Sequence, residues 1–143
     1  MYIVFKNIHS LAADFSLLFL LISIFYAYFS LYKGASFTKK SKAIALLGLI
    51  GVHLQLVLGV VLYFLSPMGV SNFSAEMMKN STARLYALEH PMVMIIGIIL
   101  ITVGYSRSKK AFDNSSKFKN IAIFYTIGLI LILSRIPWKA WLG

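Results

Sequence analysis

The chain has 143 residues, of which 59% are hydrophobic and only four are acidic, and its mean hydropathy is +0.82. This composition leaves little room for a water-soluble domain, and the lack of cysteine excludes disulfides, thiolate metal sites and thioether-linked haem. Four apolar runs are long enough to cross a bilayer. We therefore expect one all-α integral membrane domain over residues 1–143, an antiparallel up-down bundle with spans at about 8–32, 43–65, 83–106 and 120–137.

The formal charge of +10 is distributed in short loops rather than along one face, which argues against a nucleic-acid partner. Nine cations lie between the first two and the last two spans, and five lie on the other side. The nine are Lys33, Lys39, Lys40, Lys42, Arg107, Lys109, Lys110, Lys117 and Lys119. The positive-inside rule then predicts that both loops are cytoplasmic and both termini lie outside.

The first span carries two polar groups near its outer end, His9 and Asp14. The apolar run is too long for the core of a cleavable signal peptide, so we interpret it as a membrane helix. The two side chains point about 140° apart on a helix and cannot easily share a partner. For Asp14 we expect a place at the interface or a neighbouring cation, with a proton-relay role as the alternative.

The second span contains His53 and Gln55. Gln55 shares one face of the predicted helix with three glycines, which favours close packing against another helix. His53 lies on nearly the opposite side. Both faces therefore need a protein or cofactor neighbour.

The third span carries Glu89 and His90 side by side, ahead of a long apolar run. An ionisable group inside a membrane costs roughly 2.5–3.5 kcal/mol on insertion scales, so it requires a partner or a ligand. His90, Gly97 and Gly104 recur every seven residues and form one stripe, for which helix packing is the favoured explanation of the glycines.

Pro91 lies within this third helix if Ser81 or Thr82 is its N-cap, as we expect. The proline ring would leave the carbonyl of Ala87 without its usual donor and bend the helix there. A start at Glu89 would make the span too short for a bilayer, so the longer, kinked helix is favoured.

The fourth span ends near Arg135, and Trp138 and Trp141 follow it. Tryptophans mark a membrane interface, which agrees with an outer C-terminus. Arg135 can extend to the surface, or it can neutralise Asp14, Glu89 or an acid group of a cofactor.

Depth along the helices brings two histidines to one level. At 1.5 Å per residue, His9 and His90 each lie about 9 Å from the outer ends of their helices, whereas His53 lies about 19 Å in. Arg84 and Arg135 lie at the outer rim. Two imidazoles at one depth suit the axial positions of a b-type haem, and guanidinium groups at the rim suit its propionates.

Three short segments support this interpretation: Asn7-Ile8-His9-Ser10, Gln55-Leu56-Val57-Leu58-Gly59 and Glu89-His90. Together they resemble one four-helix half of haem A synthase. That resemblance implies that His9 and His90 ligate haem on the outer side. Lys6 stands where the enzyme has a catalytic glutamate, and the second half is missing, so oxidation of a haem methyl group is not implied. The chain is also similar to small four-span bacterial membrane proteins of the cytochrome b type, which implies the bacterial inner (cytoplasmic) membrane.

We therefore expect a haem b protein of electron transfer, with iron between His9 and His90. The cofactor-binding residues are expected to be His9, His90, His53, Arg84, Arg135 and Glu89. Arg84 and Arg135 would hold the propionates, and Glu89 would tune or orient a ligand. His53 is left open as a supporting group, an alternative ligand, or part of a quinone site with Gln55. No catalytic residue is assigned. The redox partner would be another protein or a quinone, and a larger membrane complex is a further expected partner.

Two other classes of function stay open. One is a non-redox membrane protein, either a small subunit of a larger complex or a haem- or copper-assembly factor. Met92 and Met94 lie close to His90 in sequence, and thioether with imidazole suits copper(I). The other is a proton or ion pathway through Asp14, Glu89 and His53, although the chain lacks the internal repeat typical of transporters.

Overall fold

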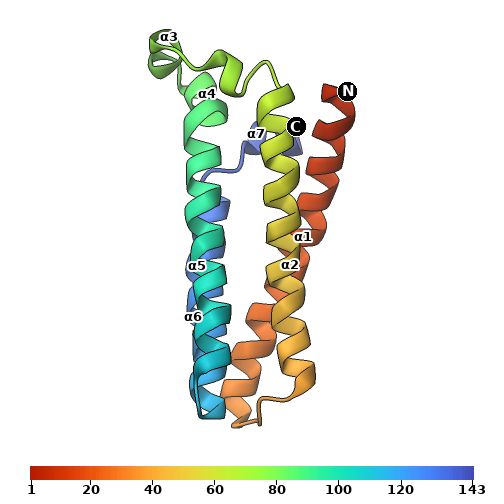
Figure 1. The fold of residues 1–143 in the computed structure, drawn as a ribbon, viewed down its shortest axis with the longest axis vertical. Coiled ribbons are helices and arrows are strands. Elements are labelled where there is room, and N and C mark those ends of the chain that lie inside the picture. The colour runs from red at the N-terminus through yellow and green to blue at the C-terminus, as the bar shows by residue number, and fades with distance from the viewer.

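A computed structural model describes residues 1–143 as a bundle of four long helices (Figure 1). Each is long and apolar enough to cross a membrane. The first, second and fourth are α1 (Tyr2–Lys33), α2 (Lys39–Leu65) and α6 (Asn114–Ser134). The third span runs over Ser81–Lys110 and includes α5 (His90–Lys110). The predicted all-α architecture is confirmed, and its four long helices are consistent with the predicted four-span bundle.

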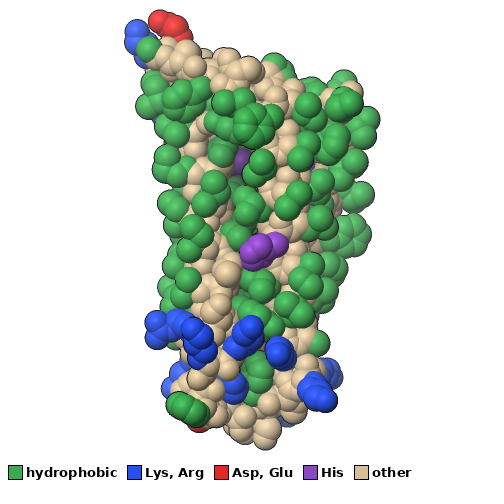
Figure 2. Space-filling model, viewed as in Figure 1, with side chains coloured by type: hydrophobic (Ala, Val, Ile, Leu, Met, Phe, Trp, Pro, Cys, Tyr) green, Lys and Arg blue, Asp and Glu red, His purple; other side chains and the backbone are tan.

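The helices form a ring in which α1 packs on α2 and α6, and α5 packs on α6 and, least extensively, on α2. Helices α1 and α5 are therefore diagonal across the bundle. Both termini lie at one end, here named the terminal end (Figure 1). The opposite end, named the basic end, holds the two loops that carry the nine cations. Figure 2 shows that these cations form a band below an apolar side wall.

A short cap crosses the terminal end between α2 and the third span. It contains η1 (Val70–Asn72) and α3 (Ala75–Lys79), and the third span then begins with α4 (Ser81–Arg84). The N-cap of the third span is Asn80, whose side-chain oxygen accepts a hydrogen bond from the Ala83 amide at 3.0 Å. The prediction of Ser81 or Thr82 as the cap was wrong by one or two residues, because the amide oxygen of Asn80 performs the same role.

Small residues let the helices approach closely. A Cβ atom at Gly97 would lie 3.1 Å from the carbonyl oxygen of Gly128, and one at Gly104 would lie 2.4 Å from the Cβ of Phe124. Both glycines of the predicted stripe therefore pack against α6, as expected. The largest fully buried side chain, Tyr125, donates a hydrogen bond to the carbonyl of Ala45 at 2.7 Å.

Several helices extend beyond the predicted spans, and the two largest differences at the terminal end concern the first and fourth helices. The first helix begins at Tyr2, six residues before the apolar run, since nothing in its opening residues breaks a helix. The fourth ends at Ser134 rather than at 137. Pro137 disfavours helical backbone at the residue before it, and Arg135 has already left the helical region (φ −130°, ψ 20°). The short helix α7 (Trp138–Leu142) follows.

At the basic end, Asp113 is the N-cap of α6 and accepts a hydrogen bond from the Ser116 amide at 2.9 Å. This hydrogen bond lowers the pKa of the Asp113 carboxyl, because it stabilises the charged form. The loop before α2 also contacts the first residue of α6, since the Phe37 amide donates a hydrogen bond to the side-chain oxygen of Asn114 at 2.9 Å.

Candidate functional site

The structure brings His9 and His90 together near the terminal end of the bundle. The centroids of the two imidazole rings are 6.4 Å apart, and the ring planes are inclined at 84°. His9 comes from α1 and His90 from the first position of α5, so the rings meet across the diagonal of the ring of helices. Facing helices of a bundle are a common source of cofactor and metal ligands.

His90 has a defined hydrogen-bonding state. Its Nδ1 lies 2.8 Å from the backbone carbonyl oxygen of Arg135. A carbonyl only accepts, so Nδ1 carries the hydrogen and Nε2 keeps its lone pair. This is the arrangement in which an imidazole serves as a ligand, with its second nitrogen oriented by an acceptor.

His9 is held by Gln55 from α2. The side-chain amide of Gln55 donates to the carbonyl oxygen of His9 at 2.8 Å and lies 3.5 Å from its Nε2. The Nδ1 of His9 and the Oε1 of Gln55 are both buried and have no hydrogen-bond partner. A Cβ at Gly59 would lie 3.2 Å from the Cε1 of His9, so this glycine leaves room for the ring. Buried polar atoms without partners are costly and indicate a ligand, a strained site or a bound water.

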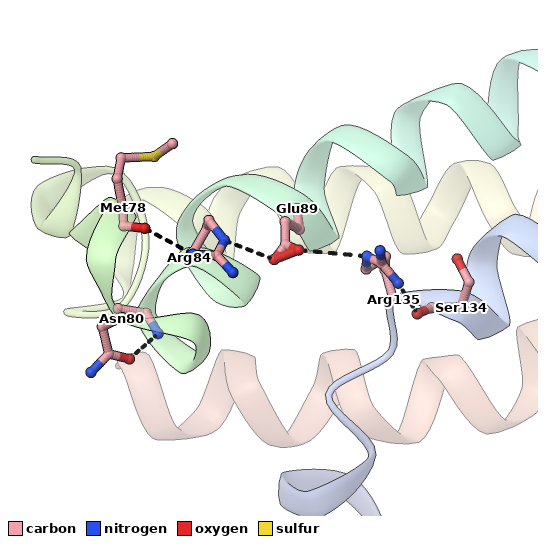
Figure 3. Close-up of polar contacts among 7 residues, drawn as sticks. Met78, Asn80, Arg84, Glu89, Ser134 and Arg135 are labelled. Atoms are coloured by element: carbon pink, nitrogen blue, oxygen red, sulfur yellow. Dashed lines mark hydrogen bonds and ion pairs between the residues drawn. The ribbon is translucent and has the colours of Figure 1, made fainter. Parts of the chain in front are cut away.

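Glu89, the residue before His90, links two arginines (Figure 3). Its carboxylate oxygens lie 3.5 Å from the Nε of Arg84 and 3.7 Å from the Nε of Arg135. One Nη1 donor of each arginine reaches a backbone carbonyl, that of Arg84 the Met78 carbonyl and that of Arg135 the Ser134 carbonyl, both at 2.8 Å. All three charged side chains are about one-third or more exposed, so each pair contributes at most about 1 kcal/mol to stability.

Arg135 therefore holds two consecutive residues of the third span. Its side chain pairs with Glu89, and its carbonyl accepts from His90. Among the partners considered from the sequence, Arg135 contacts Glu89 and not Asp14. The contact with His90 was not predicted, because a backbone carbonyl carries no sequence signal.

The predicted disturbance at Pro91 takes the form of a π-helical turn, η2 (Leu85–Glu89). The His90 amide donates to the carbonyl of Leu85, five residues earlier. The carbonyl of Ala87, which Pro91 deprives of its usual donor, accepts a hydrogen bond from the Tyr63 hydroxyl at 2.8 Å. Tyr63 was not singled out from the sequence, where a tyrosine near a helix end reads as an interfacial residue.

Replacement of Tyr63 by phenylalanine should leave the carbonyl of Ala87 unpaired in an apolar environment. We expect a loss of about 1 kcal/mol in the free energy of unfolding. Unfolding in mixed micelles, followed by circular dichroism, measures the difference. Tyr32→Phe is the matched control, since Tyr32 is 88% exposed and its hydroxyl makes no hydrogen bond. Equal stability of the two variants would show that the Tyr63 hydroxyl is not needed here.

Two predicted residues lie outside this cluster. His53 is exposed on the other side of α2 from Gln55, with its Nδ1 2.8 Å from the Leu49 carbonyl oxygen. A shared site of His53 and Gln55 is therefore not formed, since Gln55 contacts His9. Asp14 is exposed on α1 and makes no ion pair.

The cluster offers two imidazole ligands and no more. No group of three or more His, Cys, Asp or Glu side chains is placed to hold a metal ion. A bare transition-metal ion of ordinary coordination number would thus lack ligands, whereas an iron porphyrin needs only axial ones from the protein.

The fold and this cluster define a four-helix protein whose helices can each span a membrane. Comparison with protein-family models, with curated proteins and with solved structures found no match.

Proposed function

We propose that this protein is a b-type haem-binding membrane protein of electron transfer, with iron held between His9 and His90. The observation that carries the proposal is the meeting of these two imidazoles across the bundle, 6.4 Å between ring centroids. The proposal includes the family relationship to one half of haem A synthase and to four-span bacterial proteins of the cytochrome b type. It also includes placement in the bacterial inner membrane with both termini outside.

The separation of the rings supports this cofactor. A metal–imidazole bond is about 2 Å long, and the bonded nitrogen lies roughly 1 Å from the ring centre. His9 and His90 would thus hold one iron with their ring centroids roughly 6 Å apart. The observed 6.4 Å matches this value.

The state of the ring nitrogens also supports it. His90 has its Nδ1 hydrogen committed to Arg135, which leaves Nε2 free for a metal. The Nε2 of His9 lies 3.5 Å from the donor nitrogen of Gln55, so His9 would give up this weak contact to ligate iron through Nε2. Haem would supply the remaining four ligands and the one-electron chemistry, while the chain supplies the axial imidazoles, their orientation and the surrounding charge.

The charges at the rim fit the cofactor's acid groups. Arg84 and Arg135 share the single carboxylate of Glu89, so the three side chains keep one net positive charge. We propose that the arginines hold the propionates and that Glu89 sets the position of His90 through Arg135. The electron donor and acceptor would be another membrane protein or a quinone.

The test is titration of the detergent-purified protein with haemin, followed by absorbance. We expect saturation at one haem per chain and a reduced-minus-oxidised spectrum with the sharp α band of six-coordinate haem b. Absence of saturable binding, or a spectrum of five-coordinate haem, would contradict the proposal. Colourless protein that co-purifies with a larger complex would instead favour a structural subunit.

Glu89→Gln tests the role of the carboxylate. Loss of a negative charge would leave the surroundings of the iron more positive. Such surroundings stabilise the reduced form, which carries less positive charge, so we expect a higher midpoint potential with haem still bound. Removal of an outer group that orients a metal ligand typically costs 10–100-fold in affinity, and a loss near the lower end of that range is expected here. Spectroelectrochemistry measures the potential. Glu76→Gln, an 87% exposed carboxylate in the cap, is the matched control. An unchanged potential would exclude a tuning role for Glu89.

A further inference from the structure

Two ionisable side chains, Asp14 on α1 and His53 on α2, are exposed on the lipid-facing wall of the bundle. His53 is 14 residues after Lys39 and 12 before Leu65, which places it about 21 Å and 18 Å from the two ends of α2. The hydrocarbon core of a bilayer is about 30 Å thick, so His53 lies well inside it.

Asp14 lies at the same depth as His53. Ser16 of α1 contacts Gly51 of α2, where an added Cβ would lie 3.3 Å from the Ser16 Cα. Asp14 is two residues before Ser16, and His53 is two residues after Gly51. The two helices run antiparallel, so both steps lead about 3 Å toward the terminal end (Figure 1).

The two side chains point in opposite directions from this contact. At 100° per residue, Asp14 lies about 160° around α1 from Ser16, and His53 lies about 160° around α2 from Gly51. Asp14 therefore faces away from α2, and His53 faces away from α1. They cannot meet within one chain.

The contacts of His53 suit its charged form. Its Nδ1 lies 2.8 Å from the Leu49 carbonyl oxygen, and its Nε2 lies 3.5 Å from the Thr102 hydroxyl oxygen. That hydroxyl donates its own hydrogen to the Ile98 carbonyl at 2.7 Å, so both partners of His53 are acceptors. An imidazole that donates from both nitrogens is a cation.

Neither Asp14 nor His53 has an opposite charge beside it. The ion pairs of the structure involve Glu76 and Glu89 at the terminal end, and no other carboxylate. Charged groups within membrane helices are costly, and they are normally paired with one another or turned to the bundle interior. The lipid-facing wall thus presents a carboxylate and an imidazolium at one depth, on different sides of the molecule and each without a counter-charge.

We propose that copies of this chain associate head to tail in the membrane, with Asp14 of one copy paired to His53 of the next. Copies inserted in the same orientation carry both groups at the same depth, so the pair forms without tilting either bundle. The exposed side chains around the two groups are apolar and supply the packing surface: Leu11, Phe15 and Leu18 near Asp14, and Ile50, Leu54 and Val57 near His53. The contact joins two different surfaces, so it produces rows or closed rings rather than a two-fold dimer.

This association goes beyond the proposed haem function. It involves neither the His9–His90 pair nor the cluster of Glu89 and the two arginines. Its test without haemin therefore succeeds or fails independently of haem binding.

The experiment places the full chain in phosphatidylcholine liposomes without haemin. The chain has no cysteine, so Ser115→Cys, at an exposed position of the basic end, can carry a donor or an acceptor dye. Energy transfer is measured as the protein-to-lipid ratio rises, and stepwise photobleaching counts the chains in each assembly. We expect assemblies of two and more chains. Asp14→Leu and His53→Phe should each weaken association about tenfold, as expected for a lost polar contact between membrane helices.

Two further samples separate this pairing from a loss of folding. The exchanged variant, Asp14→His with His53→Asp, should restore association, because it presents the same two groups with their places reversed. An equal mixture of Asp14→Leu and His53→Phe should form pairs but no longer assemblies, because each variant keeps one of the two complementary surfaces.

Each of three outcomes would overturn the inference. A chain that stays single at every protein-to-lipid ratio would assign Asp14 to a helix of another protein. An Asp14→Leu variant that associates as strongly as the unchanged chain would place the contact elsewhere on the wall. A mixture of the two single variants that forms no pairs would show that Asp14 and His53 do not meet.

Discussion

His90→Ala is expected to abolish the spectrum of six-coordinate haem, and His9→Ala is expected to do the same. Each substitution removes one of two axial ligands, and no other imidazole is placed to replace it, since His53 is exposed on a different face. Loss of a direct ligand should exceed the 10–100-fold effect typical of outer groups, so we expect at least a 100-fold loss of haem affinity.

His53→Ala is the matched control for this pair. It removes the third histidine of the chain, and we expect normal haem content and an unchanged α band. The measurement is the haem-to-protein ratio after purification, together with the reduced-minus-oxidised spectrum. Retention of six-coordinate haem in either His9→Ala or His90→Ala, or its loss in His53→Ala, would contradict the assignment. Circular dichroism of each variant shows whether the helices still form.

Gly128→Leu is expected to have the largest effect on stability. A Cβ at this position would lie 2.5 Å from the Cγ1 of Ile101 and 2.9 Å from the carbonyl oxygen of Gly97. The backbone oxygen cannot move away without separating α5 from α6. Overpacking of a tight contact costs about 1–3 kcal/mol, and the added bulk of leucine places this variant at or above the upper value.

The control for this variant is Ile130→Leu, on the same helix. Ile130 is 60% exposed on the lipid-facing wall, so its stability should change by less than about 0.5 kcal/mol. Unfolding of both variants in mixed micelles gives the comparison. A Gly128→Leu variant as stable as Ile130→Leu would show that α5 and α6 do not pack through these glycines.

The four spans could be predicted because long apolar runs between charged loops determine them directly. The packing of Gly97 and Gly104 on a neighbouring helix was also readable, since glycines on one stripe favour close approach. Helix ends were less predictable: Asn80 performs the capping role expected of Ser81 or Thr82, and Pro137 ends the last span early.

At the candidate site, depth arithmetic brought His9 and His90 to one level, and the structure shows them in proximity. Their role as ligands stays a prediction. The partners of these rings were not accessible from the sequence. The Arg135 carbonyl that orients His90 is a backbone group, and Tyr63 reaches Ala87 from another helix. Such contacts depend on how the helices are rotated and paired, which hydropathy does not report.

The wide turn ahead of Pro91 has a consequence for the charge cluster. Arg84 and Glu89 are five positions apart, and in a regular α-helix such residues point about 140° away from each other. A π-helical turn instead brings positions five apart above one another. At this five-residue spacing, their 3.5 Å ion pair thus depends on the π-helical geometry of the turn. Deleting one residue between Arg84 and Glu89 would convert the wide turn to regular α-helix and leave the two side chains four positions apart, about 40° around the helix axis, so their ion pair would be kept.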